Sequence, residues 1–369
     1  MPADLPPALT YQAPSTQDRL DRLWSRGTTF LGTRTAIMGG AMSWVSERRL
    51  VSAISNAGGF GVIAGGSMRS DALAAEIRAT QALTRAPFGV NLITMHPELE
   101  SLIDTCVAAG VGHVVLAGGV PRGAIVRRVR DGGARVIGFA PALPVAYRMI
   151  RAGVDALVIE GSEAGGHIGP VSLNVLAQEI LPHITDVPVF VAGGIGRGEA
   201  IASYLRMGAA GAQLGTRFAA AAESIAHPRF KHAFIHARAR DAQPTVQLDP
   251  NFPVIPVRAL QNAATGRFQQ HQADMVRRVA AGELSREEAQ LAVEHFWAGA
   301  LRRAVIEGDV EHGSLMAGQS VGMVTHEQPI AEIIDELIDQ ARRALDDGPA
   351  VNAPAASAPA ANVRFTAPG

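Results

Sequence analysis

The segment ALVIEGSEAGGHIG, residues 156–169, decides the fold and points to the chemistry. Its first five residues form a mainly apolar run between Gly153 and Gly161, too short for a helix and typical of a strand buried on both faces. Four glycines and one imidazole, His167, share the rest of the segment. Glycines let backbone N–H groups approach a bound group closely, and an imidazole exchanges protons near neutral pH. The segment therefore predicts a strand that ends in an active-site loop; the alternative is a tight turn with a surface histidine.

A unit of short strand, glycine turn and amphipathic helix repeats on both sides of this segment. Eight such strands separated by seven helices predict a (β/α)8 TIM barrel of the α/β class with a C-terminal helical insertion or cap. A doubly wound open sheet, the alternative, usually stops at five or six strands. The expected strands lie at residues 35–38, 61–64, 88–92, 113–117, 135–139, 156–160, 189–192 and 211–214. The expected helices lie at residues 47–56, 70–82, 97–109, 122–131, 144–152, 173–181 and 198–207.

Composition shifts divide the chain into four parts. We expect a disordered arm at residues 1–18, a barrel core at 19–218, a helical cap with closing helices at 219–346 and a disordered Ala/Pro-rich tail at 347–369. A short helix is expected at 18–26, across the base of the barrel. Within the third part, amphipathic runs predict helices at 271–281, 285–299 and 330–345, and the three prolines of 248–260 predict an extended crossing.

Charge and cysteine content narrow the classes of partner and compartment. The 369 residues include 33 Lys and Arg against 34 Asp and Glu, so we expect a small-molecule substrate and no nucleic-acid or membrane partner. Cys106 is the single cysteine; it cannot form an intrachain disulfide or a Cys-based zinc site, and its apolar surroundings predict a buried, packing thiol. With no apolar leader or long apolar run, the expected location is cytoplasmic. Exposed helices that could pair between two copies of the chain would allow a homodimer.

Glycines cluster after the expected strands, which predicts that one mouth of the barrel is lined by backbone. GGIGRGEA (193–200) and GTRF (215–218) follow the seventh and eighth strands, where barrels commonly bind phosphate on free N–H groups and a helix start. The spacing of Gly194, Gly196 and Gly198 is not GxGxxG and falls late in the chain, which disfavours a dinucleotide fingerprint. The remaining alternative is that these glycines only allow tight turns.

Other residues at the expected mouth fit a flavin better than a metal or a nucleophile. Met42 in MGGAMSW (38–44) can lie against a planar ring, Asn91 can pair with a pyrimidine-like edge or cap the next helix, and Glu160 ends the sixth strand. His232 and His236 lack the Glu of HExxH, so no metal site is expected, and no GxSxG elbow occurs. A phosphate cradle, an apolar mouth and one histidine predict an FMN enzyme; a flavin-binding barrel without turnover is the alternative from another class.

Six ordered motifs carry a resemblance to a known family: residues 38–63, 87–91, 160–169, 189–200, 211–218 and 316–324. Between about residues 35 and 345 the chain resembles the nitronate monooxygenase (2-nitropropane dioxygenase) family of FMN-dependent barrels. That family also contains flavin-dependent enoyl-acyl-carrier-protein reductases and NAD(P)H:quinone reductases. The resemblance implies His167 as the catalytic residue. It implies flavin contacts at Ala41, Met42, Ser43, Asn91, Glu160, Gly165, Gly194, Gln213, Leu214, Gly215 and Thr216.

The resemblance implies the superfamily more strongly than the substrate. We expect first an enzyme that oxidises alkyl nitronates with O2 to a carbonyl compound and nitrite, in which His167 takes the α-proton of a neutral nitroalkane. The alternative is an NAD(P)H-dependent flavin oxidoreductase that acts on enoyl thioesters or quinones. Glu160 departs from the Gln of many nitronate monooxygenases, and the EGSEAGGHIG form is closer to enoyl reductases. A carboxylate at that position disfavours an anionic nitronate close by.

Overall fold

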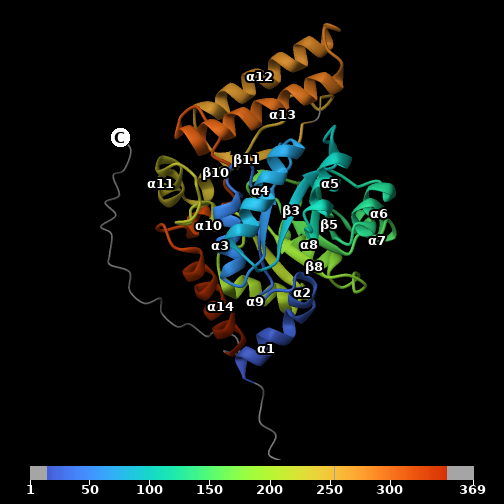
Figure 1. Cartoon of the computed structure of the whole chain (residues 1–369). Coiled ribbons are helices and arrows are strands. Elements are labelled where there is room, and N and C mark those ends of the chain that lie inside the picture. The colour runs from blue at the N-terminus through green and yellow to red at the C-terminus, as the bar shows by residue number, and fades with distance from the viewer. Residues whose placement is uncertain (1–14, 253, 347–369) are drawn as a thin grey trace, which may run out of the picture.

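The computed structural model describes residues 15–252 and 254–346, and its centre is a closed barrel of parallel strands (Figure 1). The eight strands follow the order β1-β9-β8-β6-β5-β4-β3-β2. A parallel bridge between Met38 and Phe60 closes the ring, with the Phe60 N–H donating to the Ile37 carbonyl at 2.9 Å. The predicted TIM barrel is therefore confirmed. The strands are β1 (Ile37–Gly39), β2 (Gly61–Ala64), β3 (Phe88–Ile93), β4 (His113–Ala117), β5 (Arg135–Phe139), β6 (Ala156–Glu160), β8 (Val189–Ala192) and β9 (Gly211–Leu214).

The strands form where the sequence has short apolar runs because each run is buried on both faces. Interior positions of β2, β4, β6, β8 and β9 are buried, as expected for strands that face the barrel interior on one side and helices on the other. Six of the eight strands have the predicted bounds. β1 starts two residues later and ends one residue later than predicted, and β3 ends one residue later.

Helices surround the barrel, and the last described helix completes the ring. α14 packs along α9, and the Gln340 side chain accepts a hydrogen bond from the Gly198 N–H at 2.8 Å. α14 is thus a barrel helix that arrives after the cap, as the expected closing helices required. The ring consists of α3 (Arg48–Asn56), α4 (Ser70–Leu83), α5 (Leu99–Ala108), α6 (Gly123–Asp131), α7 (Leu143–Arg151), α8 (Leu173–Ile180), α9 (Gly198–Arg206) and α14 (Ile330–Asp346).

The chain enters the barrel through two short helices at the end opposite the cap (Figure 1). These are α1 (Thr16–Leu23) and α2 (Ser25–Leu31). The expected disordered arm at 1–18 is wrong for its last residues, because Ser15 and Asp18 form a capping box that starts α1. Residues 1–14 of that arm, and the expected tail at 347–369, lie outside the described residues.

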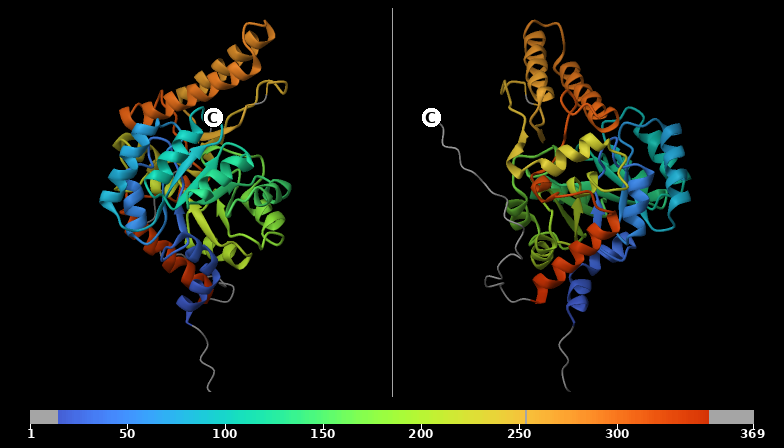
Figure 2. Two further views of the ribbon diagram at one scale, coloured as in Figure 1. Left: turned by 45° about the vertical axis from the view of Figure 1, so that its right-hand side comes forward. Right: turned by 90° about the vertical axis from the view of Figure 1, so that its left-hand side faces the viewer.

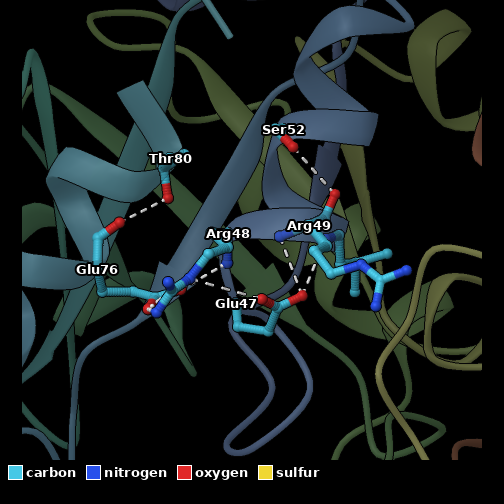
Figure 3. A network of polar contacts seen from close by, with 7 residues as sticks. Glu47, Arg48, Arg49, Ser52, Glu76 and Thr80 are labelled. Carbon is cyan, nitrogen blue, oxygen red and sulfur yellow. Dashed lines mark hydrogen bonds and ion pairs between the residues drawn. The ribbon is translucent and has the colours of Figure 1, made fainter. Parts of the chain in front are cut away.

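A polar network joins α3 to α4 (Figure 3). Glu76 is 6% exposed; its carboxylate accepts a hydrogen bond from the Arg48 backbone N–H at 2.6 Å and pairs with the Arg48 guanidinium. Glu47 caps α3 by accepting from the Arg49 N–H at 2.9 Å, and burial raises the pKa of Glu47. This network fixes the start of α3, and with it the end of the loop that contains Ala41, Met42 and Ser43.

A helical hairpin and a small sheet form the cap. α12 (Ala263–Ala280) and α13 (Arg286–Arg302) rise at the top of Figure 1 and project from the barrel in both views of Figure 2. They pack through a separate apolar cluster that includes Phe268, Met275 and Trp297. The small antiparallel sheet has the order β10 (Ala242–Pro244), β11 (Val257–Leu260), β7 (Gly166–His167). The shorter connecting elements are α10 (Thr216–Ala219), α11 (Pro228–His236), η1 (Ala239–Asp241), η2 (Arg303–Glu307) and η3 (Gln319–Met323).

The cap differs from the sequence-based expectation at the start of one helix. α12 begins eight residues before the expected start at 271, because the Asn262 side chain caps it and the helix runs through Gly266. The described residues of the expected crossing at 248–260 contain no helix, as predicted, and the crossing ends in β11, which pairs with β7 at His167. Residue 253 of that crossing lies outside the described residues. The division of the chain into barrel core and cap remains an interpretation.

Helix α5 contains the single cysteine. Cys106 is fully buried, as predicted, and burial raises the pKa of its thiol to about 12. The thiol is therefore an apolar packing group rather than a nucleophile. Within residues 15–252 and 254–346, no helix combines the length and apolarity that crossing a bilayer requires.

Candidate active site

A cavity of about 410 Å³ opens at the carboxyl ends of the strands, beneath the cap. This is the face where barrel enzymes place their sites, and the volume falls within the range of small-molecule pockets. All the residues that the sequence predicted for the site line this one cavity. They are Ala41, Met42, Ser43, Asn91, Glu160, Gly165, His167, Gly194, Gln213, Leu214, Gly215 and Thr216.

Two neighbouring turns offer free backbone donors to this cavity. β8 and β9 are adjacent, with Ala192 opposite Gln213, so the turns that follow them lie side by side. Gly193 and Gly194 have positive φ values of 97° and 69°, which favour glycine. In the described part of the chain, the N–H groups of Gly194, Ile195, Gly215 and Thr216 donate no hydrogen bond to protein. Such unsatisfied donors are suited to a phosphate monoester.

The start of α9 does not contribute to this cradle as the sequence suggested. Its first N–H, on Gly198, donates to Gln340, and a Cβ on Gly198 would lie 1.9 Å from the Leu337 carbonyl oxygen. Gly196 is covered by the Met323 side chain, and its carbonyl accepts from Arg217 at 2.9 Å. The donors are therefore limited to the first residues of the turn. The expectation that the α9 start and its dipole bind phosphate is wrong.

Amides and a thioether line the middle of the cavity. Gln213 is 8% exposed, and its side-chain amide has no hydrogen-bond partner among the described residues. Asn91 donates to the Val115 carbonyl at 3.3 Å and so does not cap a helix. Met42 lies close to Gly215: a Cβ built there would be 3.6 Å from its sulfur. The loop after β1 and the turn after β9 therefore meet over the cavity, with an unpaired amide between them.

Glu160, at the end of β6, is a partly buried carboxyl group without a partner among the described residues. Burial raises its pKa to about 7, because a charged carboxylate is poorly solvated at this wall. The described residues that line the cavity include neither Lys nor Arg. Glu160 is therefore partly protonated near neutral pH, and neither Lys nor Arg among the described lining residues offsets its charge.

The cap holds His167 at the cavity mouth. Val257 of β11 pairs with His167, and the Ile168 N–H donates to the Pro256 carbonyl at 2.9 Å. The imidazole Nε2 lies 3.1 Å from Oε2 of Glu294 on α13, with the His167 side chain 40% exposed. The backbone and the ring of His167 are thus both positioned by the cap, and the ring remains accessible.

Several residues that support the site were missed by the sequence reasoning. Glu163 accepts from the Leu173 N–H at 2.9 Å and holds the start of α8 under the loop. In the MAGQ segment, the Gly318 N–H donates to Oγ1 of the predicted residue Thr216 at 3.0 Å, and the Gln319 N–H donates to the Glu163 carbonyl at 2.9 Å. Arg217 is 4% exposed and pairs with Glu336 on α14 at 2.8 Å. Glu163 and Arg217 lie in two of the sequence motifs, where a charged side chain next to glycines could have indicated a role at the site. No comparable feature of the sequence indicates a role for Glu294.

The residues present fit FMN, the cofactor that the resemblance implies. The free N–H groups on the two turns fit its phosphate, and the unpaired Gln213 amide and the Met42 side chain fit the polar edge and the face of its ring system. The donors are backbone groups, so their positions are fixed before any ligand binds.

The fold and the cavity place the chain among the (β/α)8 barrels with a small-molecule cavity at the carboxyl ends of the strands. Comparison with known proteins then gives the family: the sequence profile of nitronate monooxygenase matches residues 25–109 and 100–340. This chain belongs to the nitronate monooxygenase family, whose members are oxidoreductases, and the predicted resemblance is confirmed.

Individual relatives are described as having different activities. A Mycobacterium tuberculosis protein, (3aS,4S,5R,7aS)-5-hydroxy-7a-methyl-1-oxo-octahydro-1H-indene-4-carboxyl-CoA dehydrogenase, is 29% identical over 86% of this chain and 96% of its own length. The structure of FabK from Thermotoga maritima is 33% identical, with a TM-score of 0.77 over 87% of this chain and 97% of that chain. The nitroalkane oxidase of Streptomyces ansochromogenes is 26% identical, with a TM-score of 0.70 over 86% and 98%. The similarity extends over nearly the whole of each relative.

Proposed function

We propose that this chain is an FMN-dependent oxidoreductase in which His167 transfers a proton at a carbon next to an electron-withdrawing group. The observation that supports this proposal is that the free N–H groups of the two turns and the imidazole of His167 line one cavity. When bound, FMN supplies the two-electron chemistry. The protein binds its phosphate, orients its ring and moves the proton.

His167 is suited to proton transfer because its position is fixed by the cap while its ring stays accessible. Its backbone is fixed in the small sheet, and its ring pairs with Glu294. A carboxylate on one ring nitrogen sets the orientation of the imidazole for proton transfer. A substrate carbon placed over the cavity can then receive a proton from this ring or lose one to it.

Charge makes a neutral substrate the first candidate. Glu160 and Glu294 place carboxylates at the wall and at the mouth, and none of the described lining residues is Lys or Arg. An anionic nitronate group is repelled by such a site, whereas the uncharged conjugated acyl group of a thioester is not. We therefore propose NAD(P)H-dependent reduction of an enoyl thioester. Similarity to FabK and to a carboxyl-CoA dehydrogenase supports this choice.

Nitronate oxidation, which the sequence favoured first, is the second candidate. The family match and the similarity to the Streptomyces nitroalkane oxidase favour it. In this reaction His167 takes the α-proton of a neutral nitroalkane, and O2 is the final electron acceptor. NAD(P)H-dependent quinone reduction requires no proton donor at carbon, so the placement of His167 gives it less support.

Anaerobic stopped-flow absorbance separates these candidates. Protein loaded with FMN is mixed with NADH, with NADPH or with propyl-2-nitronate, and bleaching of the oxidised flavin is followed. Rapid bleaching by a nicotinamide, followed by reoxidation with crotonyl-CoA, is the result expected. Bleaching by the nitronate alone would reject the thioester proposal in favour of the second candidate.

A histidine variant tests the proton-transfer role separately from the choice of substrate. His167→Ala should keep FMN and its reduction by nicotinamide but lose crotonyl-CoA reduction by about 10²- to 10⁴-fold. His183→Ala, an exposed histidine after α8, is the matched control and should be unchanged. Equal activity of the two variants would reject the role given to His167.

A further inference from the structure

A second recess lies beside the catalytic cavity and shares two residues with it. The recess has a volume of about 250 Å³ and sits at the carboxyl ends of β4, β5 and β6, against α7 and α8. Phe139 and Glu160 line both spaces. The recess therefore adjoins the cavity that the proposed function uses, on the side away from the two phosphate-binding turns.

The lining of this recess is almost wholly apolar. Val145 and Met149 come from α7 and Leu176 from α8, while Val120 and Val171 come from loops at the mouth. Glu160 is the only ionisable residue among the described residues that line it. A wall of this kind favours the binding of an aliphatic group, because that group leaves water for apolar contacts. It provides no partner for a charged group.

The size of the recess distinguishes it from a packing defect. Protein interiors are close-packed, and voids larger than one water molecule are few. An apolar cavity of about 150 Å³ accepts a benzene ring, so a recess of about 250 Å³ has room for roughly six to ten carbon atoms. Such a space next to a reaction site is suited to the unreactive end of a substrate.

We infer that this recess binds the aliphatic end of the substrate's acyl chain, an inference that rests on the proposed thioester reaction. The reacting carbons then lie in the cavity near His167, and the chain passes the shared wall at Phe139 and Glu160 into the recess between α7 and α8. The enzyme therefore selects medium-length, uncharged acyl chains. Chains with a terminal carboxylate are excluded, because no described residue of the recess lining can pair with that charge.

A binding measurement with unreactive thioesters tests this selection. Isothermal titration calorimetry compares butyryl-CoA with octanoyl-CoA on the FMN-loaded protein; both are saturated and cannot be reduced as enoyl thioesters. Each methylene group buried strengthens binding by up to about fourfold. Octanoyl-CoA should therefore bind at least tenfold more tightly than butyryl-CoA.

Filling the recess should remove this difference. Val145→Trp places an indole in it, and Val171→Phe narrows it from a loop without altering a helix. Val175→Trp, at a half-exposed position on α8 that does not line the recess, is the matched control. The first two variants should bind both thioesters with similar affinity, and the control should retain the tenfold preference.

The outcomes separate the recess from the reaction. Equal affinity for the two thioesters in the unmodified protein, or a preference that survives both filling variants, overturns the recess assignment. A chain-length preference that the filling variants abolish, in a protein that does not reduce crotonyl-CoA, supports the recess and rejects the proposed reaction. Failure of both thioesters to bind rejects both.

Discussion

Glu160 gives the structure a measurable pH signature. Its pKa is raised from 4.5 to about 7 by burial, so the folded protein binds a proton more tightly than the unfolded chain does. Between pH 4.5 and pH 7 the folded state holds more protons, and the free energy of unfolding must therefore fall as the pH rises through this window. The full shift corresponds to about 3 kcal/mol. Because water reaches this cavity wall, we expect about 1–3 kcal/mol in the FMN-free protein.

Glu160→Gln removes the titration while keeping the shape of the side chain. Urea unfolding of both proteins without FMN, from about pH 4.5 to pH 8, gives the difference in free energy of unfolding. The variant should gain about 1–3 kcal/mol relative to the unmodified protein across that range, and the difference should level off above pH 7. Glu47, whose pKa burial also raises, titrates in both proteins and cancels. A difference that is flat, or that shrinks as the pH rises, would refute the reasoning.

Three further changes test other parts of the structure. Glu294→Gln removes the charge beside His167, so kcat for crotonyl-CoA should fall about tenfold while nicotinamide reduction of FMN, followed by stopped flow, is unchanged. Gly194→Ala forces a side chain into a φ of 69°, at roughly 1–2 kcal/mol, and against Glu163; FMN affinity measured by fluorescence titration should fall at least tenfold. Glu76→Ala removes the buried acceptor of the Arg48 N–H and should lower the free energy of unfolding by about 1–3 kcal/mol in urea.

The barrel strands could be predicted because each carries its signal locally. A run such as Ala156–Glu160 is apolar, short and bounded by glycines, and burial on both faces leaves no other arrangement for it. The capping box at Ser15 was a local signal too, but it stands within a Pro- and Ala-rich stretch that conceals it.

The cap could not be predicted in the same detail because its contacts join distant parts of the chain. β7 has only the residues Gly166–His167, and it becomes a strand by pairing with β11. Nothing near Glu294 in sequence indicates that its carboxylate faces His167. Gln340 likewise satisfies the start of α9 from the last described helix, so the sequence overstated the donors available at that turn.

The residues of the cavity were predictable as a set, because the carboxyl ends of barrel strands meet on one face. The electrostatic environment of these residues was harder to predict. Glu160 is visible in the sequence, but its burial and the absence of Lys and Arg from the described cavity lining come from packing. The sequence favours nitronate oxidation although Glu160 already disfavours an anionic nitronate there. The burial of Glu160 in the structure adds support for an uncharged reacting group.

The identity of the released cofactor tests the central claim most directly. Purified protein is denatured, and the supernatant is analysed for flavin by chromatography against FMN and FAD standards. Free donors on two adjacent turns, suited to one phosphate, predict FMN at close to one molecule per chain after reconstitution. Release of FAD, or a protein that stays colourless after incubation with FMN, would contradict the account.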